Sequence, residues 1–77
     1  MAKLSRTEIV HLARQFEREQ LKGYKIVDID SSYMECYNIT IIKLYLVSRN
    51  HRIYKVHFDV DNDTLEIRFE GQIKFVD

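Results

Sequence analysis

The chain contains no proline, no tryptophan, two glycines and a single cysteine among its 77 residues. With so few residues that break helices and strands, we expect long secondary-structure elements and no linkers. No apolar run approaches the roughly 18 residues that span a bilayer, and the N-terminus lacks the apolar segment of a signal peptide. We therefore expect a cytoplasmic protein that has no membrane partner.

Residue patterns that carry chemistry are also scarce. Cys36 has no partner for an intramolecular disulfide, and His11, His51 and His57 do not have the spacing of metal ligands. The sequence lacks a glycine-rich phosphate loop and a serine in a nucleophile-elbow pattern. We predict no metal, no cofactor and no enzymatic activity.

One acidic segment resembles a calcium loop only in part. Asp59, Asp61, Asp63 and Glu70 occupy the first, third, fifth and twelfth places of such a loop. Thr64 stands at the sixth place, where the sharp turn requires glycine, and the flanking residues alternate as strands do. We interpret the segment as the solvated tip of a hairpin.

The net charge and the length of the chain limit the kinds of partner that we expect. Twelve basic and twelve acidic residues cancel and are interspersed, which argues against a strong general attraction to nucleic acid or to an anionic membrane. The chain forms one domain, residues 1–77, and a domain of this size buries only about 60% of its unfolded surface. Because no disulfide or metal is expected to reinforce this small core, we expect a homodimer or a complex with another protein.

The N-terminal segment has a complete helix-start signature. Ser5 and Glu8 are spaced as a capping box, in which each side chain bonds the backbone amide of the other. Gly23 suits the left-handed position after the last turn, so we predict an amphipathic helix over 6–22. Its apolar stripe comprises Ile9, Leu12, Ala13 and Phe16.

The stretch 38–47 organises the rest of the prediction. It is rich in β-branched and aromatic residues, so we interpret it as a strand. Side chains alternate across a strand, and here both sides are apolar, which predicts a central strand with one side left for a partner. One side carries Ile42, Leu44 and Leu46, and the other carries Ile39, Ile41, Tyr45 and Val47.

The next hairpin has two possible registers. A two-residue turn at Arg49-Asn50 pairs Tyr45 with Tyr54 but places Lys43 beside apolar residues. A three-residue turn avoids this burial of a charge, and we prefer it, with positive φ expected at Asn50. The preferred register opposes Leu46 to Tyr54, Leu44 to Val56 and Ile42 to Phe58.

Three further strands are expected. The pattern favours a short strand over 24–30 that ends at Asp30-Ser31-Ser32, and a last strand over 72–76 after a bend at Gly71. Between them, a two-residue turn at Asn62-Asp63 brings the apolar residues of two alternating strands together. That turn opposes Val60 to Leu65, Phe58 to Ile67 and Val56 to Phe69.

The order of one helix and then antiparallel strands, with the segment Tyr54-Lys55-Val56-His57-Phe58-Asp59, resembles PepSY domains and their cystatin-like relatives over residues 8–70. The resemblance implies a sheet wrapped on one helix and a role in binding or inhibition. A helix followed by five strands also resembles Sm-like RNA-binding proteins. The chain lacks the strand glycines that let such small barrels bend.

We predict an α+β fold in which the N-terminal helix packs on one face of a curled antiparallel sheet of four or five strands. The predicted core comprises Ile9, Leu12, Ala13, Phe16, Ile42, Leu44, Leu46, Tyr54, Val56, Phe58, Val60, Leu65, Ile67 and Phe69.

For function, we predict a small non-catalytic protein-binding module that self-associates through the face of the sheet away from the helix. The predicted interface comprises Ile39, Ile41, Lys43, Tyr45, Val47, Ile53 and His57. The alternative is binding of single-stranded nucleic acid, in which aromatic side chains stack on bases and basic groups contact phosphates. That platform would use Tyr33, Tyr37, Tyr45, Arg49 and Arg52.

Overall fold

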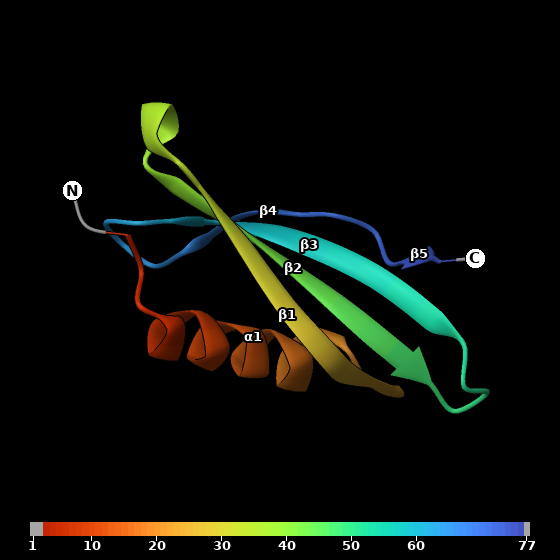
Figure 1. The fold of residues 1–77 in the computed structure, drawn as a ribbon. Coiled ribbons are helices and arrows are strands. Elements are labelled where there is room, and N and C mark those ends of the chain that lie inside the picture. Colours follow the sequence, from red (N-terminus) through yellow and green to blue (C-terminus); the bar gives the residue numbers. More distant parts are fainter. Residues whose placement is uncertain (1–2, 77) are drawn as a thin grey trace.

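The structure, a computed structural model, describes residues 3–76. The strands form one antiparallel sheet in the order β1-β2-β3-β4, with β5 also paired to β3. Figure 1 shows the helix lying along one side of this twisted sheet, which is not closed into a barrel. The predicted α+β fold is confirmed. Its elements are α1 (Arg6–Gln20), β1 (Tyr24–Met34), the 3-10 helix η1 (Glu35–Tyr37), β2 (Ile39–Ser48), β3 (Ile53–Asp61), β4 (Ile67–Glu70) and β5 (Lys74–Phe75).

The start of α1 forms as the capping pattern predicts. The Glu8 amide donates to Ser5 Oγ at 3.1 Å, and the Ser5 amide donates to Glu8 Oε1 at 3.0 Å. The helix ends at Gln20, two residues before the predicted end, and Leu21 caps it while remaining buried. Gly23 has the expected positive φ, 88°. No helix within residues 3–76 is long and apolar enough to cross a membrane.

The core lies between α1 and one face of the two central strands. The Phe16 ring stacks on Phe58 with a centroid distance of 4.4 Å. Burying each such aliphatic or aromatic side chain contributes roughly 1.5–3 kcal/mol. The buried apolar residues are Ile9, Leu12, Ala13, Phe16, Leu21, Ile42, Leu44, Leu46, Val56, Phe58 and Val60, with Thr40 as the one buried polar residue among those described.

Strand β1 differs from its prediction. It continues through the expected break at Asp30-Ser31-Ser32, because these residues pair with β2 along its whole length. A bulge between Ile26 and Asp28 leaves Val27 57% exposed and changes the alternation. Ile26 and Ile29 therefore pack together against the core, whereas simple alternation placed them on opposite faces.

The β2–β3 hairpin has the preferred register. Leu46 lies opposite Tyr54, Leu44 opposite Val56 and Ile42 opposite Phe58. The amide of Ser48 donates to the carbonyl of Arg52 at 2.9 Å, which closes the turn. Positive φ occurs at His51, at 60°, rather than at Asn50.

The β3–β4 connection does not have the predicted register. Val60 lies opposite Ile67, and Asp59 lies opposite Phe69, with an irregularity between the two pairs. The turn is longer than two residues because Leu65 adopts a φ of 62° and its amide donates to the Asp61 carbonyl at 2.8 Å. The core prediction is therefore wrong for Leu65 and Phe69, which are 40% and 54% exposed.

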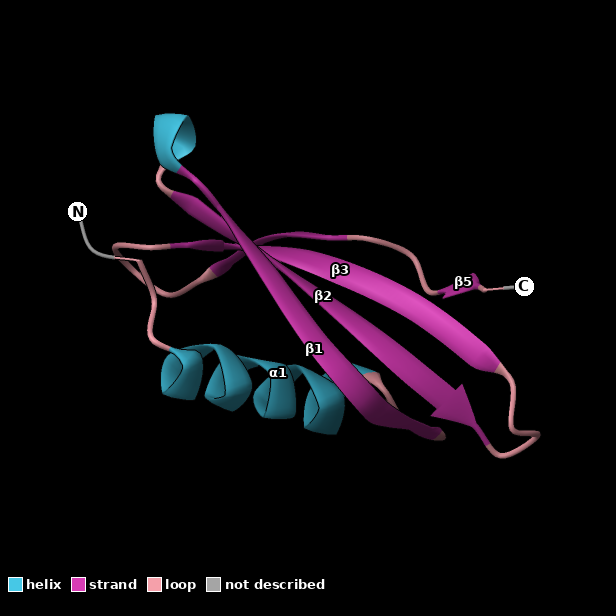
Figure 2. Ribbon diagram, in the orientation of Figure 1, coloured by secondary structure: helices cyan, strands magenta, loops and turns pink. Residues whose placement is uncertain are grey.

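The last predicted strand is also shorter than expected. Only Lys74–Phe75 pairs with β3, and Ile73 is 37% exposed. Figure 2 shows the loop that joins β4 to β5 running along the same side of β3 as both strands. Gly71, within this loop, donates its amide to the His57 carbonyl at 2.9 Å.

Candidate interaction surface

The sheet has one covered face and one open face. Alpha helix α1 packs on the first, and among residues 3–76 no other helix lies over the second. Residues directly opposite in a ladder share a face, so the pairing defines the open face row by row. Its rows are Lys25-Val47-Ile53, Asp28-Tyr45-Lys55-Lys74, Asp30-Lys43-His57, Ser32-Ile41-Asp59-Phe69 and Met34-Ile39-Asp61.

The structure thus brings all seven predicted interface residues to the open face. Four of the five apolar members are half-buried by their neighbours, and Ile53 is 37% exposed. Met34 and Phe69, which are 41% and 54% exposed, extend the apolar area at one end. The strand that organised the sequence prediction, β2, runs through the middle of this surface.

The open face also carries charges of both signs in equal number. Four lysines and four aspartates lie on it, together with His57. The two ion pairs within residues 3–76 are Arg14–Glu17 and Arg68–Asp61, so seven of these eight charged groups have no ion-pair partner among the described residues. The lysines are Lys25, Lys43, Lys55 and Lys74, and the aspartates are Asp28, Asp30, Asp59 and Asp61.

Basic groups surround a hollow of about 260 Å³ near the middle of the open face, which we call the basic hollow. The His57 ring is held between two neighbours on one side of it. Its centroid lies 5.8 Å from that of Phe69, and a Cβ on Gly71 would come within 2.7 Å of its Cε1 atom. The hollow is lined by Lys43, Lys55, Val56, His57, Gln72 and Lys74.

Side-chain oxygens occupy part of the free edge of β1. An exposed edge strand of eleven residues would ordinarily offer its unpaired amides to another chain. In β1, three amides donate to carboxylates instead, which occupies them. The bonds run from Ile26 to Glu17 at 3.3 Å, from Ile29 to Asp28 at 2.9 Å and from Ser31 to Asp30 at 2.9 Å.

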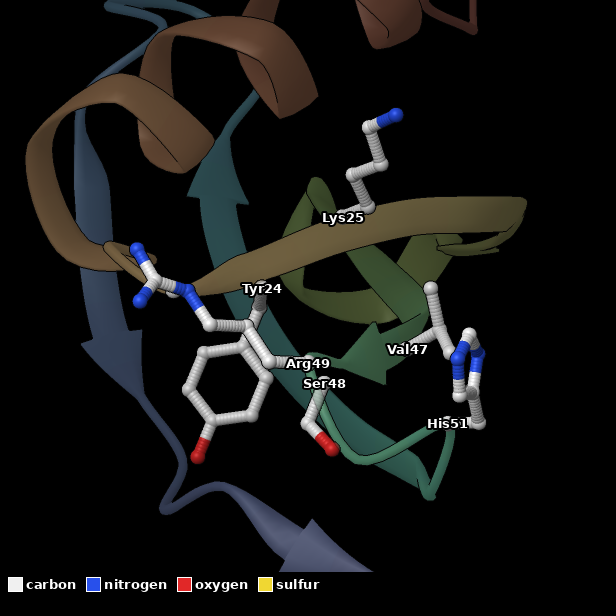
Figure 3. A pocket seen from close by; sticks show the side chains of 7 residues that line it. Tyr24, Lys25, Val47, Ser48, Arg49 and His51 are labelled. Carbon is white, nitrogen blue, oxygen red and sulfur yellow. The ribbon is translucent and has the colours of Figure 1, made fainter.

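A second pocket, of about 350 Å³, lies at the end of the sheet where β1 begins and β2 ends. Figure 3 shows Tyr24 and Lys25 on opposite sides of the β1 ribbon, as alternation requires. Arg49 and His51, from the β2–β3 turn, also line it. Because Lys25 and Val47 belong to the open face as well, a partner on that face would cover one side of this pocket.

The structure does not bring the predicted nucleic-acid platform together. Tyr33 pairs with Thr40 at one end of β2, whereas Arg49 follows Ser48 at the other end. Tyr37 lies in η1 and is 71% exposed, and Tyr45 is on the open face. Arg52 lies over the Phe75 ring, 5.7 Å from its centroid.

The acidic turn uses its carboxylate to hold the backbone. Amides of Asp63 and Thr64 donate to Asp61 Oδ1 at 2.8 and 3.2 Å, and Arg68 lies 2.9 Å from Oδ2. These bonds hold the pKa of Asp61 below its ordinary value of 3.8. Within residues 3–76, no three His, Cys, Asp or Glu side chains are grouped closely enough to hold a metal ion.

The sequence prediction omitted several members of the open face, for reasons specific to each. Lys55 alternates with Ile53 and His57, so the spacing of two already placed it there. Asp28 and Asp30 depend on the Val27 bulge, which no local signal indicates. Lys74 and Phe69 depend on pairing with β3 across the chain.

Comparison with known proteins adds no relative. No family model matches the chain, and neither a curated protein nor a solved structure matches it. The resemblance to PepSY and cystatin-like domains therefore stays a prediction.

Proposed function

We propose that this protein is a small non-catalytic interaction module that self-associates through the open face. The proposal rests on one observation, that α1 covers only one side of β2. Its even-numbered residues pack beneath α1, while Ile39, Ile41, Tyr45 and Val47 form an apolar strip over which no helix of residues 3–76 lies. Contact with another surface would remove that strip from water, which contributes about 25 cal/mol per Å² of apolar area.

The balance of charges favours a second copy as the partner. Four carboxylates on the open face would repel the phosphates of a nucleic acid, and four lysines would repel a basic protein surface. A copy of the same face presents both signs. A two-fold pair of identical surfaces is also the commonest arrangement among soluble oligomers.

The size of the face sets the expected strength. The five rows hold seventeen positions, each about 6.6 Å by 4.8 Å, which gives a flat footprint of roughly 540 Å² per copy. Two copies would bury about 1,100 Å² in total, near the lower limit of specific interfaces. We therefore expect a monomer–dimer equilibrium in the micromolar range rather than a permanent dimer.

A cytoplasmic location belongs to the same proposal. The free thiol of Cys36 is exposed, and exposed unpaired thiols are kept reduced in the cytosol.

Sedimentation equilibrium from about 1 μM to about 1 mM tests the proposal by measuring mass against concentration. We expect the wild type to approach the dimer mass and Ile41→Asp to stay monomeric, because the new carboxylate would be buried in the strip. Tyr37→Asp is the matched control, since Tyr37 is exposed on η1 and outside the face. Circular dichroism would establish whether both variants are folded.

A wild type that remains monomeric at the highest concentration would refute self-association. For the nucleic-acid alternative, a gel shift with single-stranded RNA and DNA at rising salt is the direct test, because binding through phosphates weakens as salt rises.

A further inference from the structure

The basic hollow brings four basic side chains together. Lys43 lies directly opposite His57 in the β2–β3 ladder, and Lys55 lies directly opposite Lys74 in the β3–β5 ladder. The ammonium groups of Lys55 and Lys74 are like charges in opposite positions, which is unfavourable. None of these four groups forms an ion pair within residues 3–76, although Asp30 lies directly opposite Lys43 in the β1–β2 ladder.

Two carboxylates with the required charge lie on the same face, two strands away. Asp28 and Asp30 of β1 each use Oδ1 to accept the amide of the next residue, at 2.9 Å. Their Oδ2 atoms take part in no hydrogen bond or ion pair within residues 3–76. We call these two residues the acidic edge.

The strand register places the acidic edge and the basic hollow at the same positions along the strands. Asp28 shares a row with Lys55 and Lys74, and Asp30 shares a row with Lys43 and His57. The strands β1 and β3 lie on either side of β2. Consider a two-fold axis that lies above the open face and runs parallel to β2. A rotation of 180° about this axis places the acidic edge of one copy over the basic hollow of the other and keeps every row in place.

We propose that a second copy docks on the open face about this axis, so that the acidic edge of each copy enters the basic hollow of the other. Asp28 then faces Lys55 of the second copy, with Lys74 beside it, and Asp30 faces His57. The same axis lays the apolar strip of β2 against its own counterpart. This arrangement rests on the proposed self-association and specifies its geometry.

The alternative axis, across the strands, matches charges less well. It reverses the order of the rows, so that Asp28 would face Ser32 and His57 would face His57. The axis along β2 leaves one meeting of like charges, between the two copies of Lys43. The long stem of that side chain lets its ammonium group turn toward Asp30 of the same row.

Charge reversal with complementation tests the arrangement. Cys36 is exposed on η1, so donor and acceptor dyes attached there report association by energy transfer. We expect D28K/D30K and K55E/K74E each to raise the dissociation constant at least about tenfold, because each places like charges in contact. An equimolar mixture of the two restores association, since the two reversed surfaces attract.

Two further variants make the test specific. D28N/D30N keeps the Oδ1 acceptors that cap β1 and removes only the charge, so it weakens association in the same direction without disturbing the edge. D59K separates the two axes, because Asp59 faces Ser32 about the axis along β2 but Lys55 about the axis across the strands. We expect D59K to fail to rescue K55E/K74E.

The outcomes distinguish the two proposals. A wild type that does not associate refutes the proposed function itself. If the wild type associates but the charge variants associate equally well, or their mixture is not rescued, the paired acidic edge and basic hollow are refuted while self-association stands. Rescue of K55E/K74E by D59K would assign the other axis.

Discussion

Two faces of one strand have different physical roles in this protein. Ile42 and Ile41 are consecutive in β2 and identical in chemistry, yet Ile42 is fully buried beneath α1 and Ile41 is half-buried on the open face. The covered face is closely packed and contains no charged residue among those that are buried. The open face mixes apolar and charged side chains in ordered rows. The buried face and the open face therefore differ in composition although they belong to the same strands.

The largest expected effect separates the two isoleucines. Ile42→Ala should lower the free energy of unfolding by about 2–5 kcal/mol, because it removes buried contacts and leaves a cavity. Ile41→Ala should cost about 1 kcal/mol, mainly from lower strand propensity. Urea denaturation followed by circular dichroism, at a concentration where the protein is monomeric, measures both.

Two more conservative substitutions test the same contrast if Ile42→Ala does not fold. Ile42→Val should cost about 0.5–1.5 kcal/mol, and Ile41→Val should cost almost nothing. Equal losses at the two positions would contradict the contrast between the faces.

A smaller effect is expected at Gly71, beside the basic hollow. Gly71→Ala would place a Cβ 2.7 Å from the His57 ring, so the exposed ring must turn away from residue 71, which changes its packing on Phe69. Turning an exposed side chain costs little, and we expect a stability change within about 1 kcal/mol. The readout is the NMR signal of the His57 ring, which should shift. In Gly23→Ala, where nothing lies within 4 Å, that signal should stay in place.

The smallest effect concerns pH and the β3–β4 turn. The pKa of Asp61 is lowered in the folded protein. Its carboxylate therefore stabilises the fold when the pH is above 3.8, the pKa of the unfolded chain, and this contribution is lost as the pH falls through the folded pKa. Asp61→Asn should therefore be less stable than the wild type at pH 7, with a difference that shrinks below about pH 4. Thermal unfolding at several pH values measures the difference. A constant difference from pH 7 to pH 3 would contradict the role of the charge.

Local signals were sufficient where the governing contacts are local. The capping box of Ser5 and Glu8 and the alternation of β2 and β3 each depend on neighbours in the sequence. The register of the β2–β3 hairpin followed from the rule that Lys43 should not be buried, and Lys43 is exposed. The predicted interface residues share a face for the same reason.

The errors arise where a side-chain hydrogen bond, rather than the alternation of apolar residues, decides the local structure. The bulge at Val27 lies beside Ile26, whose amide donates to Glu17 of α1, nine residues earlier. The positive φ of Leu65 accompanies a turn held by the Asp61 side chain, and β-propensity alone favours an extended leucine there. Sequence periodicity contains neither contact.

The carboxylates on the rim of β1 also bear on the product that the proposed docking would give. With those three amides engaged, β1 offers fewer free donors on which another molecule could extend the sheet. Docking by faces, as proposed, would use up the surface of both copies and give a finite pair rather than a fibre.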